Sequence, residues 1–363
     1  MWIRPQIRPA ISRETRPAHP PLRKKVPLMR NVKKTLLIVS VALIAGGAVL
    51  AGGSWAAAGF DFAKLSTHVN KLDRQVKTLE AESTAPHKAI HVESEFGNVK
   101  LVPADGDAIE LVYWTNANRT ADVKDENGVL TLSFKETESI GSIEINLMDK
   151  GQDDTTVVRV PKSFTGDISV SNDFASTTAT DLEGISSCTL VSSSGEVWAS
   201  DVSAKTLDAT SNDGVVMLNN VAADTLRAQS DNGEVGVIGC SSKDASATSG
   251  NGKMTVKEST FDQASVRADN GTIALAHLAC AKLVVAADNG TITGRELDVA
   301  DGEYTSNNGM ITLGYVGSSS AYVIDASSAN GTVTAPASNL GATRIVRALS
   351  DNGIITIEFE EDK

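Results

Sequence analysis

The chain has 363 residues, with 41% hydrophobic and only 4% aromatic side chains, and a formal net charge of −12. Its charge is unevenly placed, because residues 1–34 hold ten Lys or Arg and one acid, whereas the remainder holds 23 basic and 44 acidic residues. The acidic bulk of the chain disfavours nucleic acid and anionic wall polymers as partners, unless cations bridge the contact. The length would allow two ordinary domains, but a repeat in the C-terminal half argues for one elongated body.

The N-terminal segments predict that the chain is targeted to the membrane. Residues 35–60 form an uncharged run of twenty-six residues, long enough for one transmembrane helix. The preceding residues 1–34 are then a basic cytoplasmic tail, since positive flanks stay inside. Small residues at Trp55–Ala58 leave cleavage as a signal peptide as an alternative to a retained anchor. Met29 is a second candidate start of translation.

Residues 61–88 predict a juxtamembrane linker or a short coiled coil. Apolar residues recur in steps of three and four from Phe62 to Leu79, with Val and Leu in the positions typical of parallel two-stranded coils. The pattern lasts fewer than three heptads, so a linker without a partner and a homodimer through residues 62–79 both stay open.

Residues 89–165 predict a β-rich leading region that caps the repeats. Three segments have the composition of strands, and Asp125–Gly128 has that of a hairpin turn. The predicted strands are Val99–Val102, Ile109–Trp114 and Thr156–Val160.

Residues 166–363 contain a repeat marked by nine glycines. Seven of them are nineteen residues apart and the last two come at steps of twenty-two, and Asn directly precedes seven of the nine. The residue two after each glycine is always apolar, and the residue three before is always Ser or Ala. The column glycines are Gly195, Gly214, Gly233, Gly252, Gly271, Gly290, Gly309, Gly331 and Gly353.

This period predicts an all-β fold, a parallel β-solenoid or β-helix with rungs of 19 to 22 residues. Stacking at about 4.8 Å per rung makes nine rungs about 40 Å tall. We expect Asn-Gly to supply positive φ angles at each corner and the Asn amides to form a stacked ladder. We expect the acidic end, Glu358–Lys363, to shield the edge of the last strand.

The chain resembles a bacterial family of putative adhesins with β-strand repeats, a domain family of unknown function. The resemblance rests on Ser94–Pro103, on Val158–Lys162, on rungs such as Ser230–Val235 and on Asp61–Thr67 after the predicted span. It covers roughly residues 60–363 and implies a cell-surface protein, of a Gram-positive bacterium, with no catalytic residue to carry over.

Few residues of the chain suggest chemistry. Cys188, Cys240 and Cys280 lack metal spacing and are interpreted as small buried thiols. A shared aspartate column gives a weak hypothesis of calcium binding, and Thr291/Thr293 with Thr332/Thr334 give a broken version of an ice-binding face. The aspartates of that column are Asp231, Asp269, Asp288 and Asp351.

One further column lies six residues after the glycine. Glu258, His277 and Glu296 occupy it on three successive rungs, so two carboxylates would flank an imidazole at about 4.8 Å. A solvated edge, with Lys257 and Arg295 offsetting the acids, is the simpler interpretation, but an active site would lie here if there is one.

The sequence therefore predicts a non-catalytic, single-pass cell-membrane protein, without cofactor or metal, whose N-terminus is cytoplasmic and whose repeats present an elongated acidic surface to an extracellular protein or glycan. A polysaccharide-active β-helix enzyme and an envelope-stress regulatory component are the alternatives.

Overall fold

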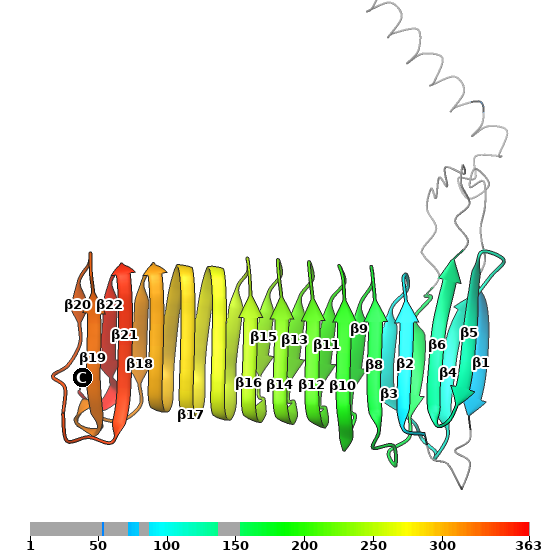
Figure 1. Cartoon of the computed structure of the whole chain (residues 1–363), viewed down its shortest axis with the longest axis horizontal. Coiled ribbons are helices and arrows are strands. Elements are labelled where there is room, and N and C mark those ends of the chain that lie inside the picture. The colour runs from blue at the N-terminus through cyan, green and yellow to red at the C-terminus, as the bar shows by residue number, and fades with distance from the viewer. Residues whose placement is uncertain (1–52, 54–71, 80–86, 137–152, 363) are drawn as a thin grey trace, which may run out of the picture. The chain divides into compact units, whose positions relative to one another are not determined.

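The computed structural model describes residues 53, 72–79, 87–136 and 153–362 (Figure 1). Within these residues no helix is long and apolar enough to cross a membrane. The predicted tail 1–34 and the predicted span 35–60 lie outside them, apart from Gly53. All the described strands belong to one compact unit made of residues 69–143 and 150–363.

That unit is all-β and mostly parallel, as predicted. Two 3-10 turns, η2 (Ser319–Ala321) and η3 (Glu360–Asp362), accompany the strands. The strands are β1 (Asp73–Leu79), β2 (Ala89–Ser94), β3 (Val99–Pro103), β4 (Ile109–Thr115), β5 (Arg119–Glu126), β6 (Val129–Glu136), β7 (Thr156–Val160), β8 (Asp167–Asn172), β9 (Thr177–Thr180), β10 (Ile185–Ser192), β11 (Val197–Ser200), β12 (Ser203–Ser211), β13 (Val216–Asn219), β14 (Ala222–Ser230), β15 (Val235–Ile238), β16 (Ser241–Ser249), β17 (Met254–Asn308), β18 (Ile311–Tyr315), β19 (Tyr322–Ser328), β20 (Val333–Thr334), β21 (Arg344–Asn352) and β22 (Ile355–Phe359).

Each regular rung has a long strand, an Asn-Gly turn, a short strand and a second turn. The long strands β8, β10, β12, β14 and β16 pair in parallel in that order, and the short strands β9, β11, β13 and β15 pair likewise. Partners are twenty residues apart between β8 and β10 and between β9 and β11, and nineteen apart in the regular rungs that follow, as in Leu207 opposite Leu226. The continuous strand β17 winds through the next rungs (Figure 1). The nineteen-residue period is therefore one turn of a solenoid-like stack.

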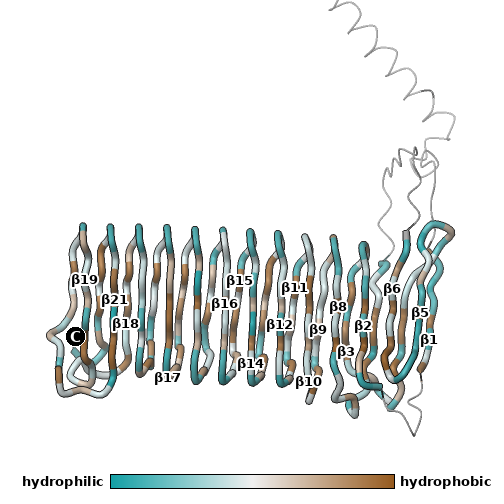
Figure 2. Tube along the Cα trace, in the orientation of Figure 1, coloured by the Kyte–Doolittle hydropathy of each residue, from teal (hydrophilic) through white to brown (hydrophobic). Residues whose placement is uncertain are grey.

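The core lies between the ladder of long strands and the ladder of short strands. Alternate residues of both point inward, so the apolar columns of the sequence become continuous buried stripes. Val197, Val216 and Val235, each two residues after a column glycine, are fully buried. Figure 2 shows the resulting alternation, with hydrophilic residues gathered at the turns. Small aliphatic side chains fill this narrow space, which explains the low aromatic content.

The column glycines are required for a different reason from the one predicted. None of the nine has φ between +20° and +160°, so the expected positive φ at the Asn-Gly corner is wrong. Instead, each α-carbon lies against the backbone of the neighbouring rung. A Cβ built on Gly252 would lie 2.1 Å from the carbonyl oxygen of Gly233, and the other column glycines give 1.7 to 2.0 Å to their neighbours. No side chain fits at that distance, because the obstacle is backbone that cannot move aside.

At several of these turns, a buried serine three residues before the glycine joins the turn to that of the preceding rung. Ala268 and Ala287 take the place of the serine before Gly271 and Gly290. The Gly233 amide donates to Ser230 Oγ at 2.8 Å, and that hydroxyl donates to the Gly214 carbonyl at 2.8 Å. Ser211 repeats the arrangement with Gly214 and Gly195 at 2.9 Å for both bonds. The serine thus satisfies an amide of its own rung and a carbonyl of the preceding rung, both of which are buried.

At the N-terminal end, order in space departs from order in sequence. The first rung, β2–β3, lies between β8–β9 on one side and β6–β7 on the other. The later strands β4 to β7, together with β1, complete this end through antiparallel pairs. The predicted hairpin at Asp125–Gly128 is confirmed, with φ of 57° at Asn127 and 78° at Gly128. The three strands predicted before residue 165 are confirmed as parts of β3, β4 and β7.

The C-terminal end is interleaved in the same way. Strand β21 pairs with β17 on one side and β19 on the other, and β22 lies between β18 and β20. The last rung in sequence is thus inserted, and the outermost rung is β19–β20 (Figure 1). The expectation that Glu358–Lys363 shields the terminal edge is wrong in this respect, because β22 has a neighbour on each side. Asp362 instead accepts hydrogen bonds from Ser318 Oγ at 3.0 Å and Ser319 N at 3.2 Å.

Ion pairs and aromatic packing hold the inserted rung. Arg347 pairs with Asp301 at 3.2 Å, and Arg344 pairs with Asp298 while its guanidinium lies 4.7 Å from the Tyr322 ring centre. Four large rings fill the core here, and Gly302 leaves the space that two of them need. The rings are Tyr304, Tyr315, Tyr322 and Phe359.

The described part of the heptad pattern is not helical. Val76 and Leu79 lie in strand β1, which pairs antiparallel with β4 from Asp73 opposite Thr115. Val76 and Leu79 are three residues apart and therefore fall on opposite faces of the strand, and Val76 is 51% exposed. The pairing with β4 thus overrides the apolar spacing of this segment. Leu72 directly precedes β1, and the heptad residues before it, from Phe62 to Val69, lie outside the described part.

Replacing a column glycine should be far more damaging than replacing one on the surface. We expect Gly252→Ala to lower the free energy of unfolding by about 3 kcal/mol, because its Cβ would overlap the Gly233 carbonyl. Gly106→Ala is the control, since a Cβ there has nothing within 4 Å. Chemical denaturation of both variants measures the difference, and equal midpoints would contradict the direct stacking of the glycine turns.

Ending the chain at residue 343 should release the outermost rung. This truncation removes β21 and β22, so β19 and β20 lose the strands that pair with them. We expect new protease cleavage between residues 316 and 343 in limited proteolysis, while cleavage elsewhere in the stack is unchanged. Leu349→Ala, which trims an exposed side chain of β21, should give the wild-type pattern. Protection of residues 316–343 in the truncated chain would disprove the insertion.

Candidate functional site

The column singled out by sequence lies at the second turn of each rung, opposite the Asn-Gly turn. Glu258, His277 and Glu296 follow one another there with φ of 54°, 51° and 51°. His277 Nε2 lies 2.9 Å from Glu296 Oε2, and Lys257 Nζ lies 3.8 Å from Glu258 Oε1. Among the described residues, no hydrogen bond or ion pair joins Glu258 to His277. The structure thus brings two of the three residues together.

The backbone explains why this column is polar. Its members from Asp181 to Glu296 all have positive φ, and the earlier ones are residue types that tolerate that conformation. Those earlier members are Asp181, Asp201, Asn220 and Gly239. The side chains of Glu258, His277 and Glu296 are 61%, 55% and 49% exposed, as in a solvated edge. Their arrangement can hold a surface ion pair but does not enclose a substrate.

The Asn-Gly edge carries the predicted amide ladder, which is confirmed. Asn251 Nδ2 donates to Asn232 Oδ1 at 3.0 Å, and Asn270 Nδ2 donates to Asn251 Oδ1 at 3.0 Å. The ladder follows spatial order through the interleaved end, and its members are Asp213, Asn232, Asn251, Asn270, Asn289, Asn308, Asn352 and Asn330. Each amide inside the ladder both donates and accepts, so the ladder is satisfied without a ligand.

Three of the four aspartates beside the ladder, Asp231, Asp269 and Asp288, contact cationic or amide groups of the chain. Arg267 Nη2 lies 3.3 Å from Asp269 and 3.5 Å from Asp288, and Asn307 donates to Asp288 at 3.4 Å. Gln229 donates to Asp231 at 3.4 Å. Within the described ranges, no three His, Cys, Asp or Glu gather as a metal site would require.

The threonine pairs are further apart than the sequence suggested. The inserted rung adds Ile354 and Thr356 to Met310 and Thr312 between them, because β22 separates β18 from β20. The ice-binding hypothesis is weakened accordingly.

The three cysteines are buried and free, as predicted. Burial raises the pKa of Cys188 to about 12 and the pKa values of Cys240 and Cys280 to about 11. A thiol that stays protonated is a poor nucleophile, so these residues serve packing.

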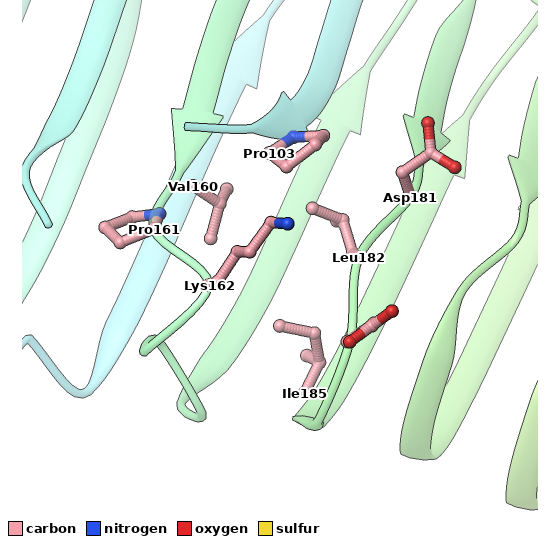
Figure 3. A pocket seen from close by; sticks show the side chains of 8 residues that line it. Pro103, Val160, Pro161, Lys162, Asp181, Leu182 and Ile185 are labelled. Atoms are coloured by element: carbon pink, nitrogen blue, oxygen red, sulfur yellow. The ribbon is translucent and has the colours of Figure 1, made fainter. Parts of the chain in front are cut away.

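A hollow of about 360 Å³ lies where the leading strands meet the regular rungs (Figure 3). Its lining combines one cation, two carboxylates and apolar side chains, but no hydroxyl, thiol or imidazole. The lining residues are Pro103, Val160, Pro161, Lys162, Asp181, Leu182, Glu183 and Ile185. The sequence did not predict this hollow. Two features of the sequence could have indicated it: the prolines Pro103 and Pro161, and the spacing of twenty residues, rather than nineteen, from Ala175 to Gly195.

A second hollow of about 300 Å³ includes Glu296 but neither Glu258 nor His277. It exists because Gly314 replaces a side chain between Arg295 and Glu358 on the face of the short strands. The column predicted as the place of an active site therefore does not share one cavity.

Comparison with known families decides the relationship. The model of the family described as Toastrack DUF4097 matches residues 87–346. The chain belongs to the Toastrack DUF4097 family. The predicted family resemblance is thereby confirmed, and the Ser94–Pro103 and Val158–Lys162 motifs fall within the match. Asp61–Thr67 falls outside both the Toastrack match and the described residues.

Solved structures similar to this Toastrack chain come from bacteria. A "putative cell adhesion protein" from Clostridium sporogenes is 11% identical, with 80% of this chain and 100% of that chain covered and a TM-score of 0.23. A "putative adhesin" from Bacteroides fragilis is 13% identical, with 80% and 98% covered and a TM-score of 0.33. A "putative adhesin" from Parabacteroides merdae is 11% identical, with 79% and 96% covered and a TM-score of 0.38. No curated protein matches the chain.

A substitution at Glu258 can test whether the second turn needs only a residue that adopts positive φ or needs the carboxylate itself. We expect Glu258→Asn to raise the free energy of unfolding by about 0.5 to 1 kcal/mol, because Asn adopts positive φ more readily than Glu. Lys257→Asn, one residue earlier, is the matched control and should bring no gain. Thermal or chemical unfolding measures both, and a loss of stability in Glu258→Asn would show that the carboxylate itself is needed.

Proposed function

We propose that this Toastrack chain is a non-catalytic surface protein, which holds its solenoid outside the cell membrane and binds an extracellular protein or glycan along repeated polar columns. The membrane-spanning segment is residues 35–60, with the basic residues 1–34 on the cytoplasmic side. Residues after position 34 carry a net charge of −21, which suits an exported, soluble surface.

The observation that carries the proposal is that polar groups are spread over the rungs instead of converging. Each turn column offers one side chain per rung, and the best catalytic candidates are about half exposed or more. Enzymes bury most of a substrate in a cleft and hold their acid and base groups there. Polar side chains that are spread over many rungs favour additive binding, in which each rung contributes a few contacts to a long partner.

An enzyme acting on polysaccharides is the second candidate, because Glu296 both pairs with His277 and lines a hollow. A component of envelope-stress signalling, acting through residues 1–88, is the third. A binding protein would retain a polymer, an enzyme would cleave it, and a signalling component would do neither.

The test incubates the purified full chain, in detergent micelles, with bacterial wall polysaccharides and host glycans. Retained chain and released oligosaccharide are measured together. We expect retention without release, and we expect the triple variant Glu258→Gln, His277→Gln, Glu296→Gln to keep retention within about twofold, since exposed single charges contribute little. The control is Asp181→Asn with Asp201→Asn in the same column.

Release of new chain ends that disappears in the triple variant, but not in the control, would overturn the proposal in favour of an enzyme. Absence of both retention and release would favour a partner within the cell envelope, and residues 1–88 alone should then keep the regulatory effect.

A further inference from the structure

The outermost C-terminal rung, β19–β20, ends the stack without the cover that the rungs before it have. Val333 is 40% exposed, whereas Ile311 and Ile355, at the same position of the two rungs beside it, are fully buried. Ile324 and Ala326 are only partly buried against the core. Leu340, in the segment after β20, is 86% exposed. The solenoid core is therefore partly open at this end.

The backbone edge of β19 is half covered. The Ile324 amide donates to Ser338 Oγ at 3.0 Å, and Tyr322 O accepts from the Asn339 amide at 3.1 Å. In a parallel strand alternate residues face the same side, so Ala326 and Ser328 also turn their backbone groups outward. Within the described ranges, no backbone group pairs with these outward-facing groups. An edge of this kind is a template for another strand.

Charge, the usual protection of an edge, is scarce here. Residues 304–343 contain one charged residue, Asp325, in a chain that is 21% charged. The edge strands of the other end differ, since β1 carries three charged residues and β5 carries five. The charged edge strands at the N-terminal end thus oppose pairing with another strand, whereas the edge strand β19 at the C-terminal end carries only one charge.

From these observations we propose that the β19–β20 end is a docking surface for the same end of a second copy of this chain. A twofold axis places the two β19 strands antiparallel, and antiparallel edges are self-complementary in hydrogen bonding. A chain this acidic repels itself over most of its surface, so self-association requires a neutral contact. The β19–β20 end, whose one charged residue is Asp325, provides a nearly neutral contact, whereas a basic partner would be drawn to the acidic columns instead.

The pairing gives the proposed surface protein a further property, which rests on the proposed function. With an anchor before residue 61, the joined ends are the last part of each stack, so pairing links chains on two facing membranes. The self-association itself does not depend on the anchor.

The test measures the association of the purified full chain in detergent micelles by sedimentation. Wild type should dimerise, and Val333→Lys with Leu340→Glu should weaken association at least about tenfold, because charge replaces the apolar contact. Ile354→Lys is the matched control: Ile354 is 45% exposed but lies on the side of the stack, in the inserted rung, and its variant should associate like wild type.

Cross-linking locates the contact. The native cysteines are buried, so a Cys at position 333 is the reactive thiol of a Val333→Cys variant. We expect disulfide-linked dimers from Val333→Cys and none from Phe174→Cys, whose position is 62% exposed but lies near the other end. A monomeric wild type, or a dimer that survives Val333→Lys with Leu340→Glu, would overturn the inference. If vesicles carrying the full chain fail to cluster while the dimer persists, the anchoring proposal fails and the pairing stands.

Discussion

The fold depends on one close approach, that of each column glycine to the carbonyl of the glycine-turn backbone one rung away. The distances leave no room for a Cβ at any of the nine positions, so the backbone turns stack directly on one another. The buried serines and the amide ladder result from this approach, because it aligns the same residue of every rung. The apolar columns then meet in register and close the narrow core between the two ladders.

At both ends of the stack, the order of the rungs in space departs from their order in the sequence. The first rung in sequence and the last are each inserted between two others, so neither chain-terminal rung is an edge. At the N-terminal end charged antiparallel strands form the boundary, with Arg119 held by Asp154 at 3.1 Å and packed 4.6 Å from the Phe134 ring. At the C-terminal end the boundary is a nearly uncharged rung, and this difference is the basis of the proposed self-association.

The sequence predicted the features that repeat and failed where the repeat is interrupted. Period, apolar columns, buried thiols and the Asn ladder can all be read from spacing, because a fixed register places equal positions side by side. The role of glycine was misassigned, since Asn-Gly commonly marks positive φ, and only coordinates show the neighbouring carbonyl. Positive φ lies instead at Glu258, His277 and Glu296, where residue type gave little sign of it.

The order of rungs at the two ends is the other part that spacing could not reveal. The insertion of β21 could not be predicted, because steps of twenty-two residues fit either order of rungs. The hollow in Figure 3 was hidden for the same reason, as it depends on how the leading strands join the stack. Both features depend on contacts between segments far apart in the chain, which no local pattern records.

The function proposed for this architecture is binding by repetition, and the nearly uncharged β19–β20 end is proposed as the place where two stacks meet. The exposed Val333 and the open backbone edge of β19 both result from the order of the rungs in space. Hydrogen exchange across the full chain, at concentrations low enough to keep it monomeric, measures that order directly. We predict that β21 and β22 exchange more slowly than β19 and β20, and that β2 and β3 exchange more slowly than β1 and β5, although the protected strands β21 and β22 come last in sequence. Fastest exchange in β21 and β22, as for an ordinary fraying terminus, would contradict the inserted order of rungs.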